Sequence, residues 1–305
     1  MLRRHKVICI TGGKGGTGKT LVAVNLAVMF RNNGYNVLLI DGDVENPNTY
    51  LLMGGKLENR EEVYFFVPKI DELRCTKCGL CAENCLSHAL LYIKDAVPIP
   101  ILNLCSGCKL CYKICPSNAI ITDSRVIGNL YKTQINNIDL IIGELIPSEA
   151  RSAVIVKSLM EKLDIILNDH PNKYDIIIFD TAPGAHCDVE ELIQHADYII
   201  PVTEPTRFGK LDLLRIIELI KFLKKQFKVI VNRSTLLGFK EQFLKDLNLE
   251  KIQVLGDIPL DKDIVQSYCT GTPLMSDNSF NKNGEGYKAF LQVYENLIKW
   301  SEAGI

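Results

Sequence analysis

A glycine-rich segment between an apolar run and a helix most constrains how this chain can fold. Residues 13–20 read Gly-Lys-Gly-Gly-Thr-Gly-Lys-Thr and match the pattern G-x-x-x-x-G-K-S/T. Glycines let successive backbone N–H groups curl around phosphate oxygens, while Lys19 reaches the β- and γ-phosphates and the Thr20 hydroxyl binds Mg²⁺. A strand predicted at 7–10 and a helix predicted over 20–32 favour a nucleotide loop over a chance turn. The predicted nucleotide contacts are Gly13, Gly15, Gly16, Thr17, Gly18, Lys19 and Thr20.

Apolar runs and helical stretches alternate along most of the chain. Further short apolar runs predict buried strands at 37–40, 140–142, 176–179, 198–202, 229–231 and 252–255. Helices are predicted over 149–167, 188–196, 208–225, 239–246 and 284–301. Strands that alternate with helices form parallel sheets. The sequence therefore predicts an α/β fold with a doubly wound, mostly parallel sheet of the P-loop nucleoside triphosphatase type.

Residues 63–125 interrupt this alternation and hold eight of the chain's 11 cysteines. A shift of thirty residues maps the first four of these cysteines onto the last four, together with neighbouring leucine, serine and alanine residues. We expect a small α+β domain over 63–125, inserted into a discontinuous nucleotide-binding domain of residues 1–62 and 126–305.

Each cysteine run has the spacing C-x₂-C-x₂-C-x₃-C, and Pro116 follows the second run where Leu86 follows the first. The segment resembles a two-cluster bacterial ferredoxin, which implies two [4Fe-4S] clusters with the fourth cysteine of each run ligating the other cluster. The implied ligands are Cys75, Cys78, Cys81 and Cys115 for cluster one, and Cys85, Cys105, Cys108 and Cys111 for cluster two. Structural zinc is usually bound by two C-x₂-C pairs separated by a longer loop, and the spacing of these cysteines fits that arrangement poorly.

Acidic residues follow two of the predicted strands. Asp180 ends the strand at 176–179, and Asp41 and Asp43 end the strand at 37–40. Acids at strand ends of an open α/β sheet lie at its ligand edge, and a nucleotide site needs one to hold the Mg²⁺ shell. A carboxylate that only caps a turn or helix is the alternative, and it suits Asp41 better than Asp180.

These motifs resemble the MinD/ParA/Mrp/NifH class of P-loop ATPases, over residues 5–62 and about 126–300. Lys14 matches the additional signature lysine of that class. The resemblance implies that Lys14 crosses a dimer interface and reaches the nucleotide of the partner subunit. ATPases of this type with an inserted ferredoxin domain form a recognisable family, which this chain also resembles.

The resemblance also assigns roles to individual residues. Asp43 would polarise the attacking water as the switch I aspartate. Thr20, Asp43 and Asp180 would form the Mg²⁺ shell, and Asn232 and Pro259 would contact or flank the adenine base. The catalytic set is then Lys14, Lys19 and Asp43.

Cys187 lies seven residues after Asp180, just beyond the predicted switch loop. The nitrogenase iron protein, which belongs to the same class, has a cluster-ligating cysteine at that offset. Cys187 is therefore a candidate redox thiol or a ligand of an interface-bridging cluster. The alternative is a small residue packed at the start of a helix.

Composition excludes several classes of function. The formal net charge of −1 means that the chain has no overall positive field to attract nucleic acid. The sequence contains no run of eighteen apolar residues, so no membrane-spanning helix is predicted. The sequence predicts a cytoplasmic, ATP-dependent homodimer that binds ATP, Mg²⁺ and two [4Fe-4S] clusters, and serves an unidentified redox or metal-cofactor protein. Three roles compete: ATP hydrolysis coupled to electron transfer, assembly of an iron–sulfur or other metal cofactor, and MinD-like positioning with structural clusters.

Overall fold

The computed structural model describes residues 5–236, 239–276 and 280–303. The chain forms two compact units. The first comprises residues 1–61 and 129–305, and the second comprises residues 62–128.

The first unit is built on a sheet whose central strands are parallel. The full strand order is β11-β10-β9-β1-β8-β2-β7-β6-β3, of which β3 and the start of β6 belong to the second unit. Strand β1 pairs in parallel with β8 and β9, and β2 pairs in parallel with β7 and β8. The strands are β1 (Lys6–Thr11), β2 (Val37–Gly42), β3 (Glu61–Ile70), β6 (Ile120–Ile135), β7 (Ile138–Leu145), β8 (Ile176–Thr181), β9 (Tyr198–Thr203), β10 (Val229–Val231) and β11 (Val254–Asp257).

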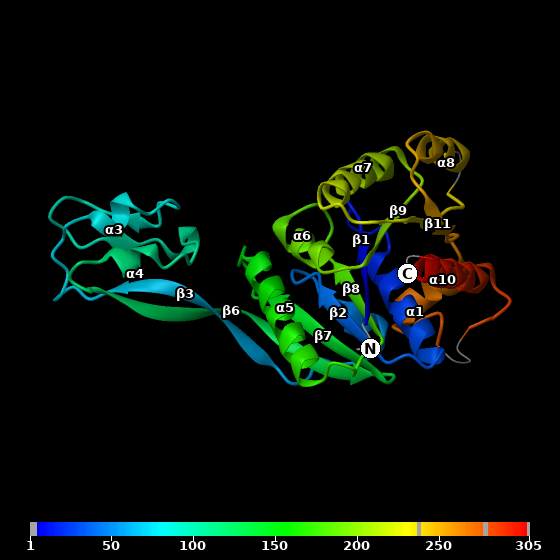
Figure 1. Cartoon of the computed structure of the whole chain (residues 1–305), viewed down its shortest axis with the longest axis horizontal. Helices are drawn as coiled ribbons and strands as arrows, with labels where there is room; N and C mark the ends of the chain where they lie inside the picture. Colours follow the sequence, from blue (N-terminus) through cyan, green and yellow to red (C-terminus); the bar gives the residue numbers. More distant parts are fainter. Residues whose placement is uncertain (1–4, 237–238, 277–279, 304–305) are drawn as a thin grey trace. The chain divides into compact units, whose positions relative to one another are not determined.

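Helices cover both faces of this sheet (Figure 1). Alternate β1 side chains, such as Ile8 and Ile10, join a core with α1 and α10. Helix α6 contacts β1 and β2, α5 contacts β2 and β7, and α7 contacts β9. These long helices are α1 (Lys19–Asn32), α5 (Ser152–Asp169), α6 (Cys187–Gln194), α7 (Arg207–Phe222) and α10 (Glu285–Ala303). The predicted doubly wound, mostly parallel α/β fold is confirmed.

Several elements were not expected from the sequence. The short α2 (Thr49–Leu52) follows β2, and α9 (Lys262–Thr270) follows β11. Asp261 caps α9 by accepting hydrogen bonds from the backbone N–H groups of Asp263 and Ile264. Helix α8 (Lys240–Leu249) begins one residue after its predicted start, and β11 begins two residues later than expected.

The second unit contains two short helices, α3 (Leu80–Glu83) and α4 (Leu110–Ile114), each within one cysteine run. It also contains the antiparallel pair β4 (Leu90–Leu91) and β5 (Ile99–Pro100), and a 3₁₀ turn, η1 (Leu102–Leu104). The backbone conformation repeats at the same spacing as the sequence. Residues in the left-handed conformation recur thirty positions apart. The repeated positions are Lys77 and Gly107, Gly79 and Lys109, and His88 and Asn118.

Candidate functional site

The glycine-rich loop joins the end of β1 to the start of α1, as expected for a phosphate loop. Gly18 has φ 98°, and a Cβ there would lie 2.3 Å from the side-chain nitrogen of Asn232, so both conformation and space require glycine. The Lys19 ammonium and the Thr17 hydroxyl each donate to the carbonyl oxygen of Lys14, both at 3.4 Å. The loop is thereby curled upon itself, and its residues Gly15, Gly16 and Gly18 line a cleft.

This cleft has a volume of about 960 Å³ and lies in the first unit. It brings together most of the residues that the sequence assigned to a nucleotide. The predicted residues that line it are Gly15, Gly16, Gly18, Lys19, Thr20, Asp43, Asn232 and Pro259. Residues that sequence reasoning missed also line it: Ser152, Asp188, Arg233 and Tyr268. Such a volume accommodates a nucleotide-sized ligand.

Asp180 is fully buried at the end of β8, opposite Asp41 of β2 in the sheet register. Neither carboxylate oxygen of Asp180 has a hydrogen-bond partner among the described residues. Burial and the neighbouring Asp41 raise the pKa of Asp180 well above its usual value, against the opposing effects of Thr20 and Lys19. A buried carboxyl group without a hydrogen-bond partner fits the coordination shell of a divalent cation.

Asp43 and Lys19 share this electrostatic environment. Burial, together with Asp41, raises the pKa of Asp43 to about 6. Burial lowers the pKa of Lys19, although Asp180 and Asp43 oppose the change. Asp43 and Asp180 therefore both act on one buried amine, with Asp41 close to both acids, and an added Mg²⁺ would relieve the repulsion among the three carboxyl groups.

Asp41 has a different role from the other two acids. One of its oxygens accepts from the amides of Asn48 and Thr49 and from the Thr49 hydroxyl, and the other accepts from the amide of Asp43. Asp41 therefore fastens the loop that carries Asp43, as the capping interpretation of this residue expected.

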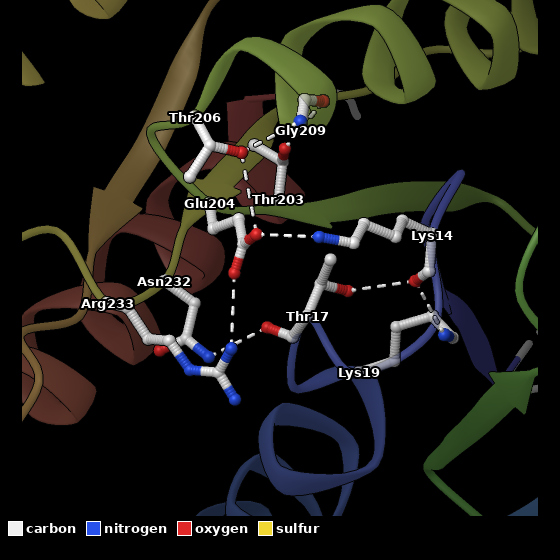
Figure 2. Close-up of polar contacts among 9 residues, drawn as sticks. All are labelled: Lys14, Thr17, Lys19, Thr203, Glu204, Thr206, Gly209, Asn232 and Arg233. Carbon is white, nitrogen blue, oxygen red and sulfur yellow. Dashed lines mark hydrogen bonds and ion pairs between the residues drawn. The ribbon is translucent and has the colours of Figure 1, made fainter. Parts of the chain in front are cut away.

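Lys14 lies beside the cleft rather than in its lining. Its ammonium donates to Oε1 of Glu204 at 2.9 Å, and Arg233 donates to Oε2 of the same carboxylate at 3.1 Å (Figure 2). Glu204 directly follows β9, so it obeys the same strand-end rule that drew attention to Asp180 and Asp43. The sequence carried that signal, and Glu204 was overlooked.

Asn232 belongs to the lining of the cleft. The amide nitrogen of Asn232 donates to the Thr17 carbonyl at 2.7 Å, so Asn232 braces the phosphate loop. Its carbonyl oxygen remains as the candidate acceptor for an adenine amino group. Pro259 and the exposed Tyr268, which belongs to α9, line the cleft as well.

The second unit gathers cysteines from both runs. Cys75, Cys78, Cys81 and Cys115 line one small cavity, and this is the set that the resemblance implied for cluster one. Burial raises the pKa of Cys111 to about 11, and the nearby thiols of Cys105 and Cys108 add to the rise.

The fourth cysteines of the two runs have matching surroundings. The amide of Ala89 donates to the Cys85 sulfur at 3.2 Å, and the amide of Ala119 donates to the Cys115 sulfur at 3.3 Å. Donors to sulfur and tightly curved backbone are features of iron–sulfur sites.

Within the described residues, no three cysteine, histidine or acidic side chains stand close enough to hold one metal ion. A tetrahedral zinc site would place its sulfurs about 3.8 Å apart, as follows from a Zn–S distance of about 2.3 Å. A four-iron cube spreads its four thiolates more widely. Cys187 is exposed at the start of α6.

Comparison with known proteins identifies the family of this chain. The model of the CobQ/CobB/MinD/ParA nucleotide binding domain matches residues 8–274. The chain belongs to this family. As a member of this family it is a P-loop nucleotide-binding protein of a class of ATPases.

Relatives of the chain within the family differ in their described roles. An uncharacterized protein of Methanocaldococcus jannaschii is 35% identical over 96% of this chain and 98% of its own length. An iron-sulfur cluster carrier protein of Pyrococcus abyssi is 22% identical over 95% of this chain and 85% of its own length. The septum site-determining protein MinD of Thermotoga maritima is 25% identical over 96% and 86%, respectively.

A solved structure of a MinD/ParA-family member has the same fold. The septum site-determining protein MinD of Pyrococcus horikoshii, complexed with Mg-ADP, covers 97% of this chain and 97% of its own chain, with a TM-score of 0.60 and 20% identity. In the part of the chain that the structure describes, no helix is long and apolar enough to cross a membrane.

Proposed function

We propose that this chain is an ATP-hydrolysing, homodimeric iron–sulfur protein that couples its nucleotide state to electron transfer with a partner protein. The observation that carries the proposal is the combination of a MinD/ParA nucleotide site with two cysteine runs whose backbone conformations repeat thirty residues apart. A positioning ATPase needs no redox centre, and sequential ferredoxin-type clusters suit electron transfer.

The residues of the cleft divide the work on ATP. Backbone amides of the loop and the Lys19 ammonium hold the phosphates. The Thr20 hydroxyl, Asp43 and Asp180 would hold Mg²⁺, which neutralises charge on the β- and γ-phosphates when it is bound. The Asp43 carboxylate would also orient the attacking water. Hydrogen bonds to Asp41 fix the loop that carries Asp43, so the carboxylate would be held in place for this role.

Lys14 would act on the nucleotide of the partner subunit. The carbonyl of Lys14 already receives the Lys19 ammonium, whereas its own side chain points away toward Glu204 (Figure 2). In the dimer the Lys14 ammonium would leave Glu204 and balance the charge that develops during phosphoryl transfer.

The second unit would supply the redox centres. Cys75, Cys78, Cys81 and Cys115 would ligate cluster one, and Cys85, Cys105, Cys108 and Cys111 would ligate cluster two. Bound clusters of this type carry single electrons, with potentials tuned by hydrogen bonds to sulfur. The amides of Ala89 and Ala119 are such donors.

A second candidate function is the assembly of an iron–sulfur or other metal cofactor. It is favoured by the similarity to the iron-sulfur cluster carrier protein of Pyrococcus abyssi. A carrier must release its cluster, whereas an electron carrier keeps it. Crossed ligation, in which each cluster draws on both cysteine runs, favours retention.

The test uses the full chain purified without oxygen. We expect a brown protein with roughly eight iron atoms per chain that hydrolyses ATP only with Mg²⁺. Stoichiometric zinc without visible absorption would contradict the ferredoxin assignment.

Incubation with an apo-ferredoxin then separates the two candidate functions. Retention of iron through many cycles of dithionite reduction and oxidation supports electron transfer. ATP-dependent loss of iron to the acceptor would favour assembly instead.

A further inference from the structure

Glu204 joins the phosphate loop to the lining of the cleft through one carboxylate. Oε1 receives the ammonium of Lys14 from the phosphate loop, and Oε2 receives the guanidinium of Arg233, which lies in the cleft lining beyond β10. Figure 2 shows Glu204 between these two cations, with the Thr206 hydroxyl 3.4 Å from Oε1. The residue is 7% exposed.

The start of α7 holds Glu204 in this position. Thr206 caps the helix by accepting from the Gly209 amide at 2.9 Å, and the Thr206 amide donates to the Glu204 carbonyl at 2.7 Å. A Cβ on Gly209 would lie 2.3 Å from that carbonyl oxygen, so the close approach needs glycine. Glu204 is therefore fixed by backbone contacts, whereas its two cationic partners are long side chains.

The Glu204 carboxylate is charged, and each of its two oxygens binds a different cationic side chain. Burial would raise the pKa of Glu204, but hydrogen bonds and charge from Lys14 and Arg233 hold it below its usual value. The side chains of Lys14 and Arg233 are 42% and 43% exposed, so either can leave toward solvent. If Lys14 leaves, Arg233 stays on the other oxygen and the buried carboxylate keeps a partner. Release of Lys14 thus avoids the large cost of an unpaired buried charge.

We propose that Glu204 is a positioning residue that retains Lys14 within its own subunit until a nucleotide-bearing second copy of the chain captures it. The inference rests on the proposed homodimer. It adds the contact that sets the threshold, which is the nucleotide concentration needed for dimerisation. Phosphate oxygens of the partner's nucleotide must outcompete Glu204 for one ammonium, so nucleotide-free copies gain nothing from Lys14. Arg233 connects the same carboxylate to the lining of the nucleotide cleft.

The variant Glu204→Gln keeps the shape of the side chain and weakens its hold on Lys14. We expect a non-hydrolysable ATP analogue with Mg²⁺ to drive dimerisation at a concentration about fivefold lower than in the unaltered protein, as followed by light scattering. This fold-change corresponds to about 1 kcal/mol, the upper range for a partly exposed ion pair.

Two further variants make the comparison specific. Asp246→Asn weakens another partly buried ion pair, with Lys210 at 2.7 Å, and should leave the threshold unchanged. In a Lys14→Ala background, Glu204→Gln should no longer favour dimerisation. The proposal would be overturned if Glu204→Gln needed as much nucleotide as the unaltered protein, or more, to dimerise. It would also be overturned if Glu204→Gln still favoured dimerisation in the Lys14→Ala background.

A measurement on the nucleotide-free protein separates this inference from the proposed dimer. The acetylation rate of Lys14 by a small acylating reagent, followed by peptide mass spectrometry, should rise about threefold or more in Glu204→Gln because the amine is released. The rate at Lys210 serves as the internal reference. If the unaltered protein fails to dimerise, the proposed function fails, and the Lys14 rate still decides the inference. Equal Lys14 rates in the two proteins would overturn it.

Discussion

Thr49 donates both its backbone amide, at 3.0 Å, and its hydroxyl, at 2.8 Å, to the same carboxylate oxygen of Asp41. Asp41 ends β2 and Thr49 begins α2, so this pair closes the loop that contains Asp43. Burial raises the pKa of Asp41 to about 6, even though the donated hydrogen bonds oppose the rise. The pair therefore fixes the loop that contains Asp43 against the sheet.

Thr49→Val removes the hydroxyl donor and keeps the shape of the side chain. Because Thr49 and Asp41 are fully buried, we expect the free energy of unfolding to fall by about 1–3 kcal/mol. Urea unfolding measures the change. Thr270→Val is the control, since that hydroxyl donates to the Gln266 carbonyl at an exposed site and its loss should cost under about 0.5 kcal/mol. If the free energy of unfolding fell equally in the two variants, the conclusion that Asp41 fixes this loop would be wrong.

Asp43→Asn tests the proposed orientation of the attacking water. The variant should still bind ATP, because the loop amides and Lys19 are unchanged, but turnover should fall about a hundredfold or more. Binding of a fluorescent ATP analogue and steady-state phosphate release measure the two effects. Turnover near that of the unaltered protein would move the role to another acid of the cleft, with Asp188 the first to examine.

Mg²⁺ binding should weaken as the pH falls through the pKa of Asp43, which is about 6. The cation needs the ionised carboxylate, so protons compete with it below that pKa and not above it. The apparent affinity for Mg²⁺ in the presence of ADP should fall roughly tenfold between pH 7 and pH 5, and Asp43→Asn should lose this part of the dependence. Titration calorimetry at both pH values measures the change. A pH profile shared by both proteins would exclude Asp43 as a ligand.

Cys115→Ala tests crossed ligation between the two cysteine runs. We expect iron to fall from about eight to about four atoms per chain, with loss of the cluster held by Cys75, Cys78 and Cys81. Cys187→Ala is the matched control and should retain all the iron. Loss of the cluster held by the second run instead would show that each run ligates its own cluster.

Local signals in the sequence were enough for the phosphate loop and for the main strands. The loop is contiguous and its glycines are needed by local geometry, so Gly18 and Lys19 could be identified without a structure. Helix α9 was missed because its nine residues carry a short apolar pattern and the Asp261 cap is a weak signal. The pairing of Lys14 with Glu204 joins residues 190 positions apart, and no local pattern encodes such a contact.

The same distinction applies to the cysteine runs and to Asn232. The thirty-residue repeat was visible in the sequence, and the structure adds that the left-handed backbone positions repeat with it. The bond from Asn232 to Thr17 could not be foreseen, because it depends on how β10 is placed beside β9 in the sheet.

The most direct test of the central claim is a redox titration of the clusters, followed by electron paramagnetic resonance, with and without Mg-ATP. Coupling between nucleotide state and electron transfer predicts a shift of the midpoint potential by tens of millivolts, where 59 mV corresponds to a tenfold change in a one-electron equilibrium. Lys19→Ala, which weakens phosphate binding, should show no shift. Identical potentials in the unaltered protein with and without Mg-ATP, under conditions where ATP is bound and hydrolysed, would contradict the account.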